Sequence, residues 1–174
     1  LVLTSRRGLP PREQWKEFTQ ENKESSLSRN IEFVQELESK GAHVQVEAVD
    51  VCDMQAISQV IQNLATAVSN PLAGVIHGAG TMTASNISNL PLDDLKTVLR
   101  PKTVGGWNLH LATQNIKLDF FVLFSSISAV WGSNQLAHYS AANHFLDALA
   151  HYRRAAGQPA LAINWGLLQA GGMT

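Results

Sequence analysis

The chain has 174 residues, of which 45% are hydrophobic, and its 13 basic and 14 acidic side chains leave a formal net charge of −1. This length and composition predict one globular domain or a large part of one. The charge balance argues against nucleic acid or a membrane as partner. Cys52 is the single cysteine, which excludes an internal disulfide and a multi-cysteine metal site. Because no apolar run could span a bilayer and no signal-like segment opens the chain, we expect a soluble, cytoplasmic protein.

The first part of the chain predicts a strand, a polar excursion, a helix and a second strand. The apolar run 1–5 predicts a buried strand that ends in a loop at Arg6. Residues 9–30 are polar and rich in charge, so we expect a surface excursion that is partly helical or disordered. Apolar residues at helical spacing then predict a helix up to Gly41, and alternation over 43–49 predicts a strand.

The remainder continues the alternation of helices and strands. Helical periodicity covers 57–64, 92–111 and 139–154, and apolar strand patterns cover 72–76, 120–124 and 160–165. Pro101 is expected to kink or divide the second of these helices. Strands that are apolar on both faces and alternate with helices predict an α/β fold, a Rossmann-like doubly wound parallel sheet with helices on both faces.

Candidate functional residues follow the predicted strands, because ligands of doubly wound sheets bind beyond the carboxyl ends of the strands. These residues are Ser5 and Arg6, Asp50 and Val51, Gly78, Ala79 and Gly80, and Ser125 and Ser126. Downstream, Tyr139 and Asn143 are four positions apart and therefore share one side of a helix. Ser126 precedes Tyr139 by thirteen positions.

This set resembles the short-chain dehydrogenase/reductase superfamily, and more closely the ketoreductase domains of modular polyketide synthases. The resemblance lies in the runs 121–126 (FVLFSS), 139–143 (YSAAN) and 164–166 (NWG), and it covers the chain except for the polar excursion. Most superfamily members carry a lysine four residues after the tyrosine. Here Asn143 occupies that position and Lys102 lies upstream, as in the polyketide ketoreductases.

The resemblance implies a catalytic set of Lys102, Ser126, Tyr139 and Asn143. It implies NADPH-dependent reduction of a β-ketoacyl chain, tethered by phosphopantetheine to an acyl carrier protein, to a β-hydroxyacyl chain. Such a reaction needs hydrogen-bond donors where the alkoxide charge develops, and a proton to complete it, which Ser126 and Tyr139 would supply. A free tyrosine has a pKa near ~10, so a nearby cation, Lys102, would help it ionise. Lys102 would also hold the cofactor ribose, and Asn143 would position the lysine or a relay water.

Cofactor binding is predicted at the other strand ends. Arg6, beside Ser5, would accommodate the 2′-phosphate of the adenosine ribose, which favours NADPH over NADH. Asp50 and Val51 would bracket the adenine. The backbone of 78–80 would pass close to the cofactor, since its glycines leave no side chain in the way.

The resemblance also implies a longer domain, of which 1–174 is the catalytic part, truncated at both ends. The first strand and the glycine-rich phosphate loop would lie upstream of Leu1, and a lid over the substrate would follow Thr174. Other domains of the same synthase are the implied partners, together with the carrier protein.

Stereochemistry is indicated by short stretches near the predicted active site. Trp131, eight residues before Tyr139, resembles the tryptophan of A-type enzymes, which give an L-hydroxyl product. The Leu-Asp-Asp motif of B-type enzymes is replaced by residues 82–84 (MTA). Leu136 stands where enzymes that select the α-substituent tend to have histidine. Met173 is a further candidate for contact with the substrate.

Each candidate residue also has an ordinary structural explanation when it is taken alone, since serines end strands and half-buried tyrosines are common. Their joint order favours catalysis. Two alternatives stay open, a catalytically silent reductase-like scaffold module of a synthase and a stand-alone short-chain alcohol dehydrogenase. His77, His138 and His144 lack convincing ligand spacing, so we expect them to be structural or surface residues and no metal site. We expect Trp107 and Trp165 to pack in the core.

Overall fold

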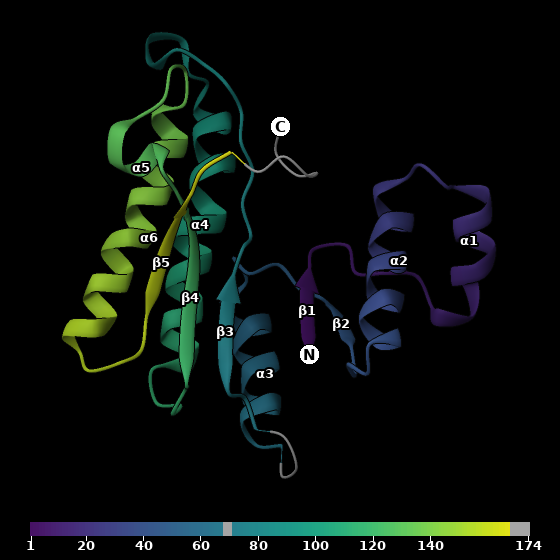
Figure 1. Cartoon of the computed structure of the whole chain (residues 1–174). Coiled ribbons are helices and arrows are strands. Elements are labelled where there is room, and N and C mark those ends of the chain that lie inside the picture. Colours follow the sequence, from purple (N-terminus) through teal and green to yellow (C-terminus); the bar gives the residue numbers. More distant parts are fainter. Residues whose placement is uncertain (68–70, 168–174) are drawn as a thin grey trace. The chain divides into compact units, whose positions relative to one another are not determined.

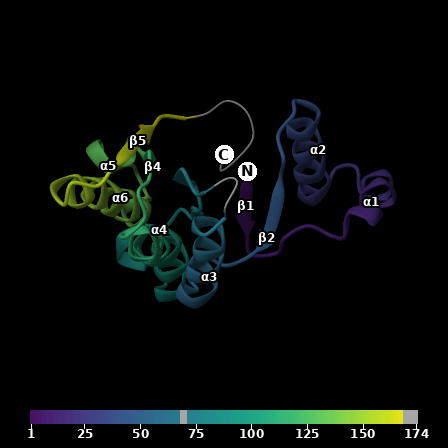
Figure 2. The same ribbon diagram turned by 90° about the horizontal axis from the view of Figure 1, so that it is seen from below.

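The computed structural model describes residues 1–67 and 71–167. Helices alternate with parallel strands, which confirms the predicted α/β fold (Figures 1 and 2). The chain divides into two compact units, Leu1–Asp50 and Val51–Thr174. None of the described helices is long and apolar enough to cross a membrane.

The first unit contains two parallel strands and two α-helices. Strand β1 (Val2–Ser5) pairs with β2 (Gln45–Ala48), and Leu3 is opposite Val46 in this register. The strands are connected through a short 3₁₀ helix, η1 (Arg12–Gln14), followed by α1 (Trp15–Glu21) and α2 (Ser26–Ser39).

The polar excursion at 9–30 is largely helical. Ser25 caps α2, since its side chain accepts a hydrogen bond of 3.0 Å from the Ser28 backbone N–H. Trp15 is only 5% exposed and packs in one cluster with Ile31, Val34 and Val44. Trp15, together with the partly buried Leu9 and Phe18, therefore anchors this segment to the core of the first unit, although its composition is mostly polar.

The second unit has a three-stranded parallel sheet in the order β3-β4-β5. The strands are β3 (Gly74–His77), β4 (Phe120–Ser126) and β5 (Leu161–Trp165). The helical elements are α3 (Met54–Ala65), η2 (Ile87–Asn89), α4 (Leu92–Thr113), α5 (Ser128–Trp131) and α6 (Ala137–Ala155). Strand β4 is two residues longer than predicted, so Ser125 and Ser126 are its last residues.

Helices α4 and α6 pack against one face of this sheet (Figure 1). Alternate side chains of β3 and β4 point into that interface, and Phe121 and Leu123 are almost fully buried there. On the opposite face of the described sheet, Ile76, Phe120 and Leu161 remain 61%, 44% and 52% exposed. The strand pattern that is apolar on both sides is thus present. Helices α4 and α6, which carry three of the four predicted catalytic residues, pack on the buried face.

Pro101 was predicted to kink or divide its helix, and two tryptophans were predicted to pack in the core. The helix is not divided, because α4 runs without interruption from Leu92 to Thr113. The lost helical hydrogen bond is tolerated because the surrounding helix is buried, with Val98 and Lys102 at 0% and 2% exposure. Trp107 and Trp165 do not lie in the core. They are 39% and 37% exposed, and their rings pack edgewise or tilted on neighbouring aromatic side chains.

Candidate active site

Lys102 is a buried cation in the middle of α4. Its Nζ donates a hydrogen bond of 2.8 Å to the backbone carbonyl of Phe124, near the end of β4. Burial lowers the pKa of Lys102 from 10.5 to about 8. A Cβ on Gly80 would lie 3.0 Å from Lys102 Cε, so glycine at this position leaves the room that the lysine side chain occupies.

Tyr139 and Asn143 lie in the first turns of α6. The Asn143 Nδ2 donates to the Tyr139 backbone carbonyl at 2.8 Å. The Asn143 Oδ1 is buried and has no hydrogen-bond partner among the described residues. Lys102 Nζ lies 6.0 Å from the centroid of the Tyr139 ring, at the outer limit of a cation–π contact. The structure therefore brings the phenol, the carboxamide and the ammonium to one side of α6.

Ser126 ends β4 and is partly buried. Its Oγ accepts hydrogen bonds from the Ser128 backbone N–H at 3.3 Å and the Ser128 hydroxyl at 3.0 Å. The neighbouring Ser125 points to the helix side, where its hydroxyl donates to the backbone carbonyl of Asn143 at 3.1 Å. This bond fastens the end of β4 to the part of α6 that carries Tyr139.

The four predicted catalytic residues all lie in the second unit, where α4, β4 and α6 pack together. The arrangement supplies two hydroxyl groups and a buried ammonium that together could donate to a developing alkoxide. The unpartnered Asn143 Oδ1 provides an acceptor for a bound water or for a ligand donor. The catalytic assignment of these residues remains a prediction.

The predicted cofactor residues divide between the two units. In the first unit Arg6 is exposed after β1, Ser5 accepts a hydrogen bond of 3.1 Å from the Gly8 N–H, and Asp50 is exposed after β2. In the second unit Val51 is held against α4. Its carbonyl accepts from Asn108 Nδ2 at 3.1 Å.

The run 78–80 directly follows β3. Gly78 and Ala79 are exposed, which leaves their backbone open to a ligand. Gly80 lies over the end of the Lys102 side chain. Open backbone beside a buried cation fits the group that the sequence predicts, a nicotinamide cofactor, and this fit does not depend on any residue of the first unit.

The predicted stereocontrol residues are only partly described. Trp131 is the last residue of α5 and is 75% exposed. Met173 lies outside the described residues. Leu136 directly precedes α6, and the Gln135 carbonyl next to it accepts a hydrogen bond of 2.9 Å from the Ser85 N–H. The loop after β3 is thereby linked to the segment that leads into Tyr139.

Two histidines that the sequence placed outside the site lie close to its residues. His77 Nε2 is 3.1 Å from the carbonyl of Pro101, the residue before Lys102. His138, the residue before Tyr139, pairs through Nε2 with the Thr83 hydroxyl at 3.0 Å. Their sequence positions, directly before Gly78 and Tyr139, are the signal that could have drawn attention to them. Among residues 1–67 and 71–167, no group of three metal-ligating side chains is assembled.

His77 also predicts a loss of stability in acid. Burial, assisted by the charge of Lys102, lowers the pKa of His77 from 6.5 to about 4. Between these values the unfolded chain binds a proton that the folded chain does not, so the free energy of unfolding decreases as pH falls from about 6.5 to about 4. The expected loss is about 3 kcal/mol. Urea unfolding of the intact protein across this range measures it.

A His77→Gln variant provides the comparison for this prediction, because glutamine does not titrate. Its free energy of unfolding should decrease less over the same pH range than that of the wild type. Equal slopes for wild type and His77→Gln would contradict the prediction.

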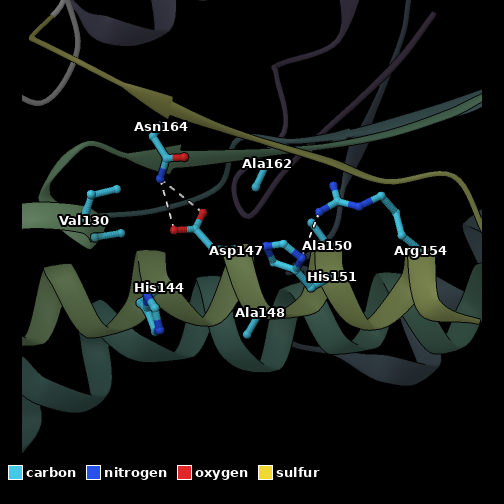
Figure 3. A pocket seen from close by; sticks show the side chains of 10 residues that line it. Val130, His144, Asp147, Ala148, Ala150, His151, Arg154, Ala162 and Asn164 are labelled. Carbon is cyan, nitrogen blue, oxygen red and sulfur yellow. Dashed lines mark hydrogen bonds between the residues drawn. The ribbon is translucent and has the colours of Figure 1, made fainter.

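A cavity of about 570 Å³ lies beside the predicted catalytic residues, between α5, α6 and β5 (Figure 3). None of the predicted catalytic residues lines it. Asn164 connects it to the site, since its Nδ2 lies 3.0 Å from Asp147 Oδ2 on the cavity side and 3.2 Å from the Ser126 carbonyl. This carboxamide therefore fixes the end of β5 relative to the serines at the end of β4.

Nearly the whole chain matches a known protein family. The model of the family described as KR domain matches residues 1–170. The chain belongs to this family. This is the family that the upstream position of Lys102 indicated in the sequence.

Curated relatives of the KR chain are polyketide synthases. It is 45% identical over 144 residues to mycoketide-CoA synthase of Mycobacterium tuberculosis, covering 82% of this chain and 3% of that protein. It is 43% identical over 175 residues to polyketide synthase GfsA of Streptomyces halstedii, covering 100% of this chain and 2% of that protein. The KR chain therefore spans only a small part of these relatives.

Solved structures that resemble the KR chain are ketoreductases. An A-type ketoreductase from a modular polyketide synthase superposes with a TM-score of 0.83 at 35% identity, covering 99% of this chain and 33% of that chain. The first ketoreductase of the tylosin polyketide synthase superposes with a TM-score of 0.79 at 38% identity, covering 100% and 34%. The KR chain spans about a third of these solved chains.

Proposed function

We propose that this KR domain reduces a β-ketoacyl thioester, carried by an acyl carrier protein, to the β-hydroxyacyl thioester in polyketide biosynthesis. The observation that carries the proposal is the buried ammonium of Lys102, held at the end of β4 and facing the Tyr139 ring of α6. A silent scaffold would gain nothing from a buried lysine that has no carboxylate partner among residues 1–67 and 71–167, since burying an ionisable group costs free energy.

The roles of the side chains follow from the charge that develops during reduction. Bound NADPH would supply the hydride for the new C–H bond at the β-carbon, and the carbonyl oxygen would then take up negative charge. The hydroxyls of Ser126 and Tyr139 donate to that oxygen, and the Tyr139 hydroxyl transfers its proton to it. Lys102 stabilises the resulting phenolate. Asn143, whose Oδ1 is buried without a partner among the described residues, holds the water that returns a proton.

The cofactor is NADPH in this proposal, and Arg6 binds its 2′-phosphate. The guanidinium is exposed at the end of β1, where it is free of the constraints of a core position. An Arg6→Ala substitution should raise the KM for NADPH by about tenfold, the value of one lost charge-assisted hydrogen bond, and leave the KM for NADH nearly unchanged. Steady-state kinetics of the intact protein with both cofactors measure the two effects. An equal effect on NADPH and NADH would contradict the role of Arg6.

The product is expected to be the L-alcohol, as in A-type enzymes. Trp131 supports this expectation, and so do similar solved structures named A-type and A1-type ketoreductases, which superpose with TM-scores of 0.83. Chiral analysis of the β-hydroxyacyl product tests it, and a D-alcohol would overturn it.

Substrate preference distinguishes the proposal from a stand-alone alcohol dehydrogenase. The intact protein should reduce a β-ketoacyl group on an acyl carrier protein with a higher kcat/KM than a free ketone that lacks the thioester. A preference for free ketones would favour the alternative. No turnover with either substrate would favour the silent scaffold.

A further inference from the structure

His77 links the end of β3 to the middle of α4. It is the last residue of β3, its side chain is 3% exposed, and its Nε2 lies 3.1 Å from the Pro101 carbonyl oxygen. Since a carbonyl oxygen only accepts, the imidazole must carry its hydrogen on Nε2. Inside a helix this carbonyl has a partner four residues on, and its second lone pair is available for the imidazole.

The position of this bond is significant because Pro101 directly precedes Lys102. The far end of the Lys102 side chain is held by the Phe124 carbonyl at 2.8 Å. The backbone of Lys102 lies next to the Pro101 carbonyl, to which His77 is hydrogen-bonded. Lys102 is thus fixed at both ends, from β3 and from β4, and its long side chain has little freedom to move away from Tyr139.

Packing around the imidazole is built for close approach of α4. A Cβ on Gly106 would lie 3.8 Å from His77 Cδ2 and 3.1 Å from Leu146 Cδ2. The neighbouring Gly105 faces Val51, where a Cβ would lie only 2.6 Å from Val51 Cγ1. These two glycines let α4 come close enough to its neighbours for a histidine side chain to reach the helix backbone.

The imidazole is suited to this position because it stays neutral. Its burial and the nearby Lys102 charge lower the pKa of His77 to about 4, so it donates a hydrogen bond near neutral pH without adding a second positive charge beside the lysine. An apolar residue would fill the space but could not donate.

We propose that His77 is a positioning residue, which holds the turn of α4 that carries Lys102 in place through the Pro101 carbonyl and does not itself touch the substrate. The inference rests on the proposed role of Lys102 in ketoreduction. Its structural part, the attachment of α4 to β3, can be tested without that role.

Two substitutions at His77 distinguish the effect of its hydrogen-bond donor from the effect of its side-chain volume. In the intact protein, His77→Leu should lower kcat by about tenfold and change the KM for the thioester by less than about twofold. The alkaline limb of the pH profile of kcat should move to higher pH, because burial lowers the pKa of Lys102 to about 8 and an ammonium that is no longer held in place regains a pKa closer to 10.5. His77→Gln, which offers a donor at similar reach, should restore most of the kcat and the wild-type pH profile.

Val75→Ala is the matched control, since Val75 lies two residues earlier on the same buried face of β3. It should lower stability without moving the pH profile. Hydrogen exchange of peptides covering 98–106 gives a readout that needs no activity. Exchange should become faster in His77→Leu than in Val75→Ala, and His77→Gln should resemble the wild type.

The outcomes are distinguishable. If His77→Leu matches Val75→Ala in kcat, pH profile and exchange, the positioning role is overturned. If the wild type reduces no β-ketoacyl thioester, the proposed function fails. In that case the exchange measurement alone decides whether His77 holds α4, and an unchanged rate at 98–106 in His77→Leu would overturn the inference independently.

Discussion

Replacing Tyr139 with phenylalanine is expected to lower the ketoreductase kcat of the intact protein by about a thousandfold. The substitution keeps the ring that faces Lys102 and removes only the hydroxyl that would donate the proton. Proton donation by a positioned side chain contributes about a hundredfold to ten-thousandfold to rate. Steady-state turnover of a β-ketoacyl thioester measures the loss, and the melting temperature should stay close to that of the wild type.

Tyr152 supplies the matched control for this experiment. It belongs to the same helix but is 55% exposed and packs on Trp107 and His110, away from the four predicted catalytic residues. Tyr152→Phe should keep the wild-type kcat. If Tyr139→Phe retained more than about a tenth of the wild-type kcat, the assigned role of Tyr139 would be wrong.

Truncation of Arg153 is expected to be the most destabilising of the substitutions considered, with a loss of about 3 kcal/mol in the free energy of unfolding for Arg153→Ala. The side chain is 1% exposed, and its guanidinium carbon lies 3.8 Å from the centroid of the Phe121 ring. It donates to the Pro159 carbonyl at 3.3 Å and lies 3.0 Å from His110 Nδ1. Alanine would leave a cavity and remove donors from buried acceptors.

Arg154 is the natural control because it is the next residue and is exposed. Its hydrogen bond of 3.1 Å to the Ala160 carbonyl lies at the surface, so Arg154→Ala should cost less than about 0.5 kcal/mol. Urea unfolding of both variants gives the comparison. Similar losses for the two arginines would show that the buried cluster does not stabilise the fold as described.

The order of helices and strands was predictable because most segments are long enough to show a clear hydrophobic pattern. The apolar run at 120–124 and the helical pattern at 139–154 both correspond to observed elements, β4 and α6. Boundaries were less predictable, since Ser125 and Ser126 continue β4 although serine is a common strand terminator. Hydrogen bonds to α6 and to Ser128, the first residue of α5, hold them in place. No local sequence pattern predicts these bonds.

The polar segment at 9–30 shows what composition alone does not determine. Its charge density predicted a surface excursion with uncertain structure, yet Trp15 and Phe18 pack into the core of the first unit. Pro101 is a similar case, because the intrinsic cost of proline in a helix is outweighed by the burial of α4. Tertiary contacts decide both cases, and neither is visible in a short window of sequence.

The residues of the candidate site were predicted from the sequence, but the hydrogen bonds between them and their surroundings were not. Motif spacing pointed to Lys102 and Tyr139, whereas the burial of the lysine and its bond to the Phe124 carbonyl required the structure. His77 was expected to be a structural or surface residue, but its contact with α4 was not predictable, since its partner is a backbone carbonyl, which every residue possesses. A hydrogen bond to a backbone carbonyl therefore cannot be predicted from residue types in the sequence.

The most direct test of the proposed function follows the hydride itself. The intact protein is supplied with a β-ketoacyl thioester on its carrier protein and with NADPH that carries deuterium at both C4 positions, and the product is analysed by mass spectrometry. Ketoreduction by this site predicts a β-hydroxyacyl thioester with one deuterium on the β-carbon, formed by the wild type and nearly absent with Tyr139→Phe. A folded wild-type protein that leaves the ketone unreduced, or forms the alcohol without deuterium, would contradict the account.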